Sequence, residues 1–287
     1  MTEPLPALVS TEWLASALGR PGLRVVDGSW YLEGSGRDAA SEYAAGHIPG
    51  AVFFDLDDSS DRNTTLPHML PSAEAFAVRM GALGLRHSDD LVVYDGSGTN
   101  LSAPRVWWMF RTFGHEHVAV LDGGLGKWCR EKRPIEQGIV TLPAGQYTAR
   151  LDSSAIRTLS AVLTNLGSRV EQLVDTRSPG RFAGTEPEPR RGLRSGHVPG
   201  SLNLPFTELV RADGTILGPE QLRTRLLGAG VDLSRPVVAT CGSGTSACAL
   251  VLGLHLLGHS QTAVYDGAWA EWGSRADTPI ETPRDQT

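Results

Sequence analysis

Cysteine is scarce in this sequence. Only Cys129, Cys241 and Cys248 occur in 287 residues, and no two of them form a CxxC pair. Neither a disulfide framework nor a zinc site is supported by so few thiols at this spacing, because both need clustered cysteines or histidines. We therefore expect no metal and no cofactor, and we expect thiols that stay reduced, as is usual in the cytoplasm.

Long apolar runs and an excess of basic residues are also missing. The longest apolar run, 247–257, is interrupted by Gly253 and His255 and is shorter than the roughly 20 residues that a bilayer-spanning helix needs. The N-terminal residues "MTEPLPALVSTEWL" lack the basic and apolar regions of a secretory signal and the arginines of a transit peptide. A net charge of −6 disfavours nucleic acid as the main partner. We expect a cytoplasmic protein that binds neither membrane nor nucleic acid.

What the sequence does contain is an internal repeat. "AGHIPGAVFFDL" at 45–56 returns as "SGHVPGSLNLPF" at 195–206, and "AVLDGGLGKW" at 119–128 returns as "AVYDGAWAEW" at 263–272. Asp95 aligns with Cys241, which gives a period of 146 residues. This period is that of a duplicated domain and is far too long for a solenoid. The sequence predicts an N-terminal domain at 1–135, a linker at 136–150 and a C-terminal domain at 151–287.

Within each copy, short β-branched runs alternate with helical patterns. The runs "LRVVD", "LVVYD", "LVDT" and "PVVAT" are typical of buried strands, and helices are expected at 73–84, 103–114, 219–230 and 246–258. Such alternation favours an α/β fold, with a mostly parallel central sheet in each domain and helices on both faces. In these sheets, sites form at the carboxyl ends of strands, which is where "VVAT" places Cys241.

The loop after this strand, "CGSGTS", is suited to an anion. The backbone N–H groups from Gly242 to Ser246 are expected to converge, and the following helix adds its positive N-terminal end. Both effects favour a thiolate at Cys241. Gly242 and Gly244 permit the positive φ angles and the close approach that a tight loop requires.

Three other interpretations of this loop are weaker. A nucleotide-binding P-loop would need a lysine, which neither the loop nor the following helix contains. A cysteine phosphatase would need an arginine at position 247, which is alanine. A merely buried cysteine is less consistent with a strand end facing a ring of amides. Because Asp95 replaces the thiol in the first copy, the N-terminal domain is expected to be catalytically silent.

Several longer motifs carry a resemblance to a known family. In order along the chain, these motifs are "VVDGSWYL" (25–32), "GHIPGAVFFDLD" (46–57), "HMLP" (68–71), "SAPRVWWMFRTFGH" (102–115), "GRFAGTEPEPR" (180–190), "SGHVPGSLNLPF" (195–206) and "VATCGSG" (238–244). In them the sequence resembles the rhodanese superfamily, and more narrowly the tandem-domain 3-mercaptopyruvate sulfurtransferases. The resemblance implies two similar α/β domains and an enzyme that transfers sulfane sulfur through a cysteine persulfide.

The resemblance also implies roles for individual residues. Cys241 is the sulfur acceptor, and Arg181 and Arg190 hold the carboxylate and the carbonyl of the donor. Ser243, His68 and Asp57 form a group that assists proton transfer. The loop residues that contact the donor or the persulfide are Gly242, Gly244, Thr245 and Ser246. By contrast, His47 and His197 occupy the same position in the two copies, one of which is expected to be catalytically silent, so both are expected to be structural.

The residues after the cysteine favour one donor over another. Relatives that prefer thiosulfate carry basic residues there, whereas Gly242 and Ser243 are neutral. The expected donor is therefore 3-mercaptopyruvate, and the resemblance implies a thiol such as thioredoxin, a small thiol or cyanide as acceptor. Thr245-Ser246 stand where Val-Thr is usual. Two alternatives stay open: a thiosulfate:cyanide sulfurtransferase, and a non-catalytic tandem module that binds a partner.

Overall fold

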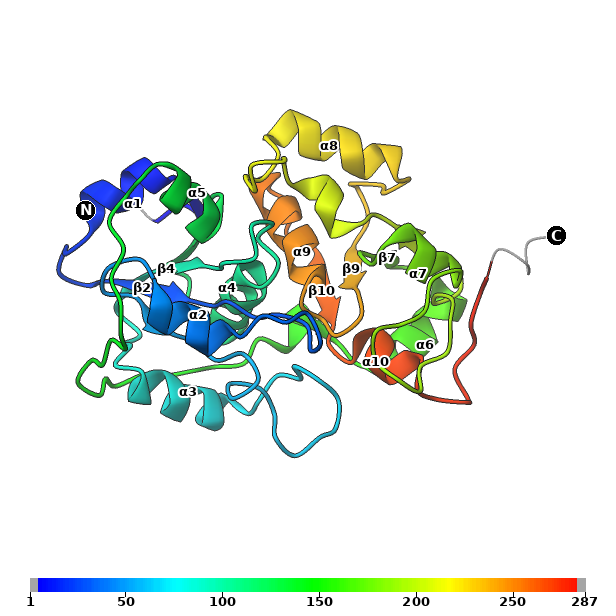
Figure 1. The fold of residues 1–287 in the computed structure, drawn as a ribbon. Helices are drawn as coiled ribbons and strands as arrows, with labels where there is room; N and C mark the ends of the chain where they lie inside the picture. Colours follow the sequence, from blue (N-terminus) through cyan, green and yellow to red (C-terminus); the bar gives the residue numbers. More distant parts are fainter. Residues whose placement is uncertain (1–4, 283–287) are drawn as a thin grey trace. The chain divides into compact units, whose positions relative to one another are not determined.

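The computed structural model describes residues 5–282, which form two compact units (Figure 1). The first unit comprises 5–62, 70–152 and 210–216, and the second comprises 63–69, 153–209 and 217–282. The segment 136–150, which the sequence predicts as a linker, is part of the first unit. Between residues 5 and 282, no helix has the length and apolar character that crossing a membrane requires.

Each unit contains one five-stranded parallel sheet, and the two sheets have the same strand order. The first is ordered β1 (Leu8–Val9), β5 (Val118–Leu121), β4 (Asp90–Tyr94), β2 (Leu23–Asp27), β3 (Val52–Phe53). The second is ordered β6 (Ile156–Arg157), β10 (Thr262–Tyr265), β9 (Val237–Thr240), β7 (Gln172–Asp175), β8 (Leu202–Asn203). Helices flank both sheets (Figure 1). The predicted α/β fold with two similar domains is confirmed.

Helices of the two units also correspond one to one. The first unit has α1 (Thr11–Ala17), α2 (Ala39–Ala45), α3 (Ala73–Ala82), α4 (Ala103–Thr112) and α5 (Gly124–Arg130). The second has α6 (Leu159–Ser168), α7 (Pro179–Ala183), α8 (Pro219–Gly228), α9 (Ala247–Leu256) and α10 (Ala268–Trp272), with short 3-10 turns at Ser153–Ala155 and Phe206–Leu209. The four predicted helices therefore end two residues earlier than the sequence pattern suggests. In α9, for example, Gly258 takes a φ of 75°, which ends the helical backbone.

The core of the second unit is formed around β9 and α9. All four residues of β9 are buried, and so are the residues of α9 from Ala247 to Leu254. A helix that is apolar on every side is one that neighbouring elements cover completely. Trp269 and Trp272 of α10 are also buried, as expected for tryptophans that pack in a core. The residue that follows β9, Cys241, is thus attached to rigid elements on both sides.

The two GH(I/V)PG turns are built in the same way. In the first unit, Nδ1 of His47 donates to the carbonyl of Tyr43 at 2.8 Å, and the two rings stack with centroids 4.2 Å apart. In the second unit, Nδ1 of His197 donates to the carbonyl of Phe182 at 2.8 Å, and the rings stack at 3.7 Å. Each histidine is held within its own unit, which agrees with the structural role expected for both.

Candidate active site

The loop that carries Cys241 is fixed by backbone hydrogen bonds to α10. The N–H of Trp269 donates to the carbonyl of Cys241, and the N–H of Ala270 donates to that of Gly242, both at 2.9 Å. Gly244 has a φ of 77°, as the tight turn requires. Cys241 itself is only 2% exposed. The loop therefore holds the thiol in a defined, largely dehydrated position.

Gly242 is expected from the sequence to take a positive φ angle and to allow a close approach in this loop. It does not adopt a positive φ, so that part of the expectation is wrong. Instead, it provides room for Arg181, because a Cβ atom at Gly242 would lie only 2.7 Å from Nη2 of that side chain. The missing side chain allows a guanidinium to approach the backbone next to Cys241.

Ser243 and His68 lie within hydrogen-bonding distance of each other in the second unit. Nδ1 of His68 lies 3.0 Å from Oγ of Ser243, and His68 is 3% exposed. Nδ1 also lies 2.9 Å from Oγ1 of Thr245, a partner that the sequence did not predict. The hydroxyl of Ser246 lies 3.1 Å from that of Thr176, the residue after β7. Thr245, which stands where valine is usual, thus adds a hydroxyl contact to His68, and Ser246 keeps a hydroxyl where threonine is usual.

Asp57 belongs to the first unit, where its side chain is exposed. Its Oδ2 accepts a hydrogen bond from the indole of Trp30 at 3.1 Å. Nearby, Asp58 forms ion pairs with Arg62 and Arg79, and burial raises the pKa of Asp55, with the Asp57 charge adding to the effect. The assignment of Asp57 to the proton-transfer group stays a prediction.

The two predicted donor-binding arginines lie in one segment of the second unit. Arg181, in α7, is partly buried and donates from Nη2 to Oε2 of Glu188 at 2.6 Å. Arg190 follows two residues after Glu188 and is half-buried. The acidic stretch "TEPEP" is therefore not simply a solvated surface, because the Glu188 side chain is only 2% exposed. The sequence did not single out this carboxylate; the one signal for it is its position between the two arginines predicted to bind the donor.

In the first unit, the loop equivalent to that of Cys241 is filled by its own carboxylate. Oδ1 of Asp95 accepts from the N–H of Ser97 at 2.8 Å and also from the Ser97 hydroxyl. Oδ2 accepts from the N–H groups of Ser102 and Ala103 at 2.9 and 2.8 Å. The helix after Asp95 starts at Ala103, whereas the helix after Cys241 starts at Ala247, so this loop is two residues longer. The donors of this loop are thus occupied by the side chain of Asp95 itself.

Replacing Asp95 with alanine is expected to destabilise the first unit by about 2–4 kcal/mol, because several buried donors would lose their acceptor at once. Urea unfolding followed by tryptophan fluorescence measures this loss. The matched control is Cys241→Ala at the equivalent position of the second unit, which is expected to cost about 1 kcal/mol. Equal losses of unfolding free energy in the two variants would show that the hydrogen bonds to the Asp95 carboxylate do not stabilise the first unit.

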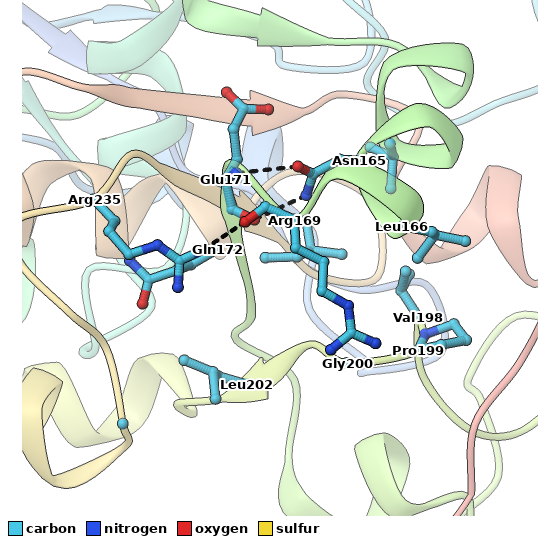
Figure 2. A pocket seen from close by; sticks show the side chains of 13 residues that line it. Asn165, Leu166, Arg169, Glu171, Gln172, Val198, Pro199, Gly200, Leu202 and Arg235 are labelled. Atoms are coloured by element: carbon cyan, nitrogen blue, oxygen red, sulfur yellow. Dashed lines mark hydrogen bonds between the residues drawn. The ribbon is translucent and has the colours of Figure 1, made fainter.

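The second unit contains a cavity of about 230 Å³, and Figure 2 shows the residues that line it. It is lined by Asn165, Arg169, Val198 and Arg235, among others, and reaches Gln172, the first residue of β7. Because Gln172 pairs with the first residue of the parallel strand β9, this cavity is at the amino ends of the strands. Cys241 follows their carboxyl ends. The cavity is therefore not part of the candidate active site.

Comparison with known proteins agrees with this architecture. The Rhodanese-like domain family matches the chain twice, at residues 10–131 and 158–275. The chain belongs to the rhodanese family.

Individual relatives cover almost the whole chain. It is 49% identical over 275 residues to a 3-mercaptopyruvate sulfurtransferase of Rattus norvegicus, with 94% of this chain and 93% of the relative covered. It is 46% identical over 282 residues to a thiosulfate sulfurtransferase of Cricetulus griseus, with 96% and 94% covered. The crystal structure of SseA, a 3-mercaptopyruvate sulfotransferase from Escherichia coli, superposes with a TM-score of 0.85 at 41% identity and covers 92% of this chain and 98% of that one. The chain is therefore a sulfurtransferase.

Proposed function

We propose that this sulfurtransferase takes sulfur from 3-mercaptopyruvate onto Cys241 as a persulfide, releases pyruvate, and passes the outer sulfur to a thiol or to cyanide. The observation that carries this proposal is the position of Arg181, whose Nη2 lies so close to Gly242, next to Cys241, that a Cβ atom at residue 242 would be only 2.7 Å away. It places a planar guanidinium, which suits a carboxylate and an adjacent ketone, beside the only thiol at a strand end.

The first half-reaction follows from the bonds involved. The Cys241 thiolate attacks the donor sulfur and forms an S–S bond, while the C–S bond breaks and its electron pair leaves on the carbon fragment. This fragment is the enolate of pyruvate, and it takes up a proton to become pyruvate. Arg181 and Arg190 bind the carboxylate and the ketone oxygen, and the arginine at the ketone oxygen stabilises the negative charge that develops there.

The proton for the enolate comes through Ser243 and His68. The 3.0 Å contact between the hydroxyl and the imidazole supports this role, because a histidine next to a hydroxyl moves protons near neutral pH. Asp57 is the carboxylate that we assign to orient this group. Amides of Gly242, Gly244, Thr245 and Ser246 hold the persulfide until an acceptor thiol or cyanide attacks its outer sulfur and regenerates the Cys241 thiolate.

The preference for 3-mercaptopyruvate over thiosulfate rests on the residues of the Cys241 loop and not on sequence identity to relatives. Relatives named for the two donors are almost equally similar to this chain, at 49% and 46% identity. Thiosulfate carries two negative charges, and the loop offers neutral Gly242 and Ser243 where a cation would suit that donor. We therefore assign 3-mercaptopyruvate as the main donor and thiosulfate as a weaker one. Sulfur donors of this family are small molecules, and we propose thioredoxin or a small thiol as acceptor, in the cytoplasm.

Release of pyruvate tests the proposal. The purified chain, given 3-mercaptopyruvate and a reducing thiol, is expected to form pyruvate continuously, as measured by NADH consumption with lactate dehydrogenase. Turnover with thiosulfate and cyanide alone would support the thiosulfate sulfurtransferase instead. No turnover with either donor would favour a binding module without catalytic activity.

A further inference from the structure

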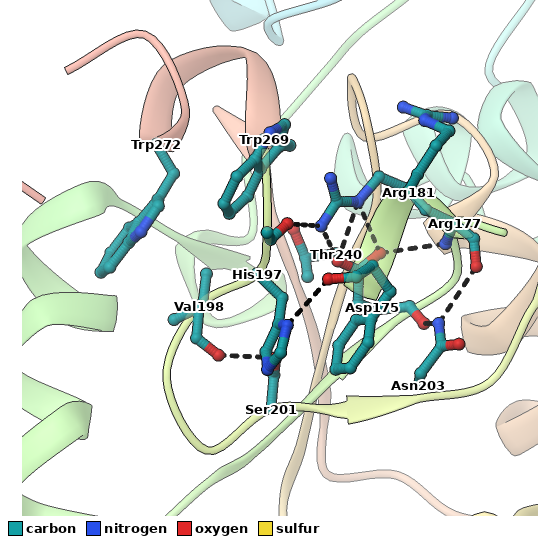
Figure 3. A network of polar contacts seen from close by, with 12 residues as sticks. Asp175, Arg177, Arg181, His197, Val198, Ser201, Asn203, Thr240, Trp269 and Trp272 are labelled. Carbon is teal, nitrogen blue, oxygen red and sulfur yellow. Dashed lines mark hydrogen bonds and ion pairs between the residues drawn. The ribbon is translucent and has the colours of Figure 1, made fainter. Parts of the chain in front are cut away.

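Arg177 is buried in the second unit and anchors a polar network (Figure 3). Its Nε and Nη2 donate to Oδ2 of Asp175 at 2.9 and 2.6 Å. Nη2 also donates to the carbonyl of Gly196 at 2.9 Å, and the guanidinium lies 4.3 Å from the ring centroid of Trp269. Burial acts to lower the pKa of Arg177, but the carboxylates of Asp175 and Glu188 outweigh it and raise the pKa.

Glu188 joins this anchor to Arg181. Its Oε1 accepts from Nη1 of Arg177 at 2.6 Å, and its Oε2 accepts from Nη2 and Nε of Arg181 at 2.6 and 3.2 Å. Arg177 has no exposed side-chain surface, whereas the side chain of Arg181 is 20% exposed. The same Nη2 of Arg181 lies beside Gly242, in the space that a Cβ atom would need. A series of hydrogen bonds therefore runs from Asp175 through Arg177 and Glu188 to Arg181, which lies next to the loop of Cys241.

We propose that Glu188 is a positioning residue for sulfur transfer, which holds the Arg181 guanidinium against Gly242 so that it meets the donor's carboxylate beside Cys241. This inference rests on the proposed function, because it assumes that the donor carries a carboxylate. Glu188 does not touch the donor; it acts through Arg181.

A carboxylate is required at this position because each of its oxygens serves a different arginine. Glutamine has one oxygen and one NH₂ group, so it accepts from only one guanidinium. Nη1 of the fully buried Arg177 donates to Glu188 and is shielded from water, whereas the partly exposed Arg181 has access to water. Glu188→Gln is therefore expected to keep Arg177 in place and release Arg181, which separates positioning from support of the fold.

The first test is steady-state kinetics of Glu188→Gln with 3-mercaptopyruvate. KM is expected to rise about 10- to 100-fold, because the donor's carboxylate loses a fixed partner, while kcat changes less than about threefold. The matched control is Glu186→Gln, whose carboxylate lies in the same segment, is exposed and accepts from the Ser178 hydroxyl. In an Arg181→Ala background, Glu188→Gln is expected to add almost nothing.

The second test does not depend on sulfur transfer. Iodoacetate and iodoacetamide alkylate the same thiol and differ mainly in charge, so the ratio of their rates at Cys241 reports whether Arg181 is in place. The ratio is expected to fall about tenfold in Glu188→Gln and to stay unchanged in Glu186→Gln. If wild type releases no pyruvate, the proposed function fails, but this ratio still decides the role of Glu188.

An unchanged KM together with an unchanged alkylation ratio in Glu188→Gln would overturn the proposal. A lower unfolding temperature with both readouts intact would likewise assign Glu188 to stability alone. If Glu188→Gln does not fold, Glu188→Asp replaces it, since aspartate keeps both oxygens on a shorter side chain. Both readouts are then expected to move in the same directions, and wild-type values would contradict the proposal.

Discussion

Cys241→Ser is expected to lower kcat/KM for pyruvate release from 3-mercaptopyruvate by at least about 10³-fold, because the variant lacks the atom that accepts sulfur. A serine hydroxyl is a poor nucleophile toward sulfur and forms no persulfide. The substitution changes the side-chain volume little at a position that is 2% exposed, so the fold is expected to persist. The coupled pyruvate assay measures the loss, and thermal unfolding verifies the fold.

Cys129→Ser is the matched control. Cys129 lies on α5 at the surface of the first unit. Partial desolvation of its sulfur still raises the pKa of the thiol, which disfavours the reactive thiolate. Wild-type kinetics are expected for this variant. Retention of full activity by Cys241→Ser, or its loss in Cys129→Ser, would place the sulfur acceptor elsewhere in the chain.

Ser243→Lys is expected to shift donor preference toward thiosulfate, raising the ratio of kcat/KM for thiosulfate to that for 3-mercaptopyruvate about 10- to 100-fold. One added charge-assisted hydrogen bond to the dianion contributes about 1.5–3 kcal/mol. The substitution also removes the 3.0 Å contact between Ser243 and His68, which is expected to slow protonation of the enolate. Both effects move the ratio in the same direction, and steady-state rates with the two donors measure it.

Ser243→Ala separates these two effects. It removes the hydroxyl without adding a charge, so it is expected to slow turnover with 3-mercaptopyruvate but to leave the efficiency with thiosulfate nearly unchanged. A donor ratio in Ser243→Lys that equals that of Ser243→Ala would show that the charge of residue 243 does not select the donor.

Much of the fold could be predicted because the chain contains it twice. Strands such as Val237–Thr240 are short, β-branched and completely buried, so their sequence alone identifies them. The helix ends were predicted less well, since apolar periodicity continues into the turn beyond Leu256. That boundary is set by the backbone at Gly258, which a hydrophobic pattern does not reveal.

The candidate site was predictable where a local motif carries the chemistry. Cys241 and its loop follow from the order of strand, glycines and helix. Contacts between distant segments were not predictable from composition or spacing: His68 meets Thr245 across 177 residues, and Glu188 appeared in the sequence as one more acid in a polar stretch. Burial distinguishes such a carboxylate from its exposed neighbour Glu186, and burial depends on the tertiary structure.

The most direct test of the central claim is the intact mass of the protein after incubation with 3-mercaptopyruvate and removal of the small molecules. The account predicts that wild type gains the mass of one sulfur atom, that cyanide removes it, and that Cys241→Ser gains nothing. A wild-type protein whose mass does not increase, or a Cys241→Ser variant that gains the mass of one sulfur atom, would contradict the account.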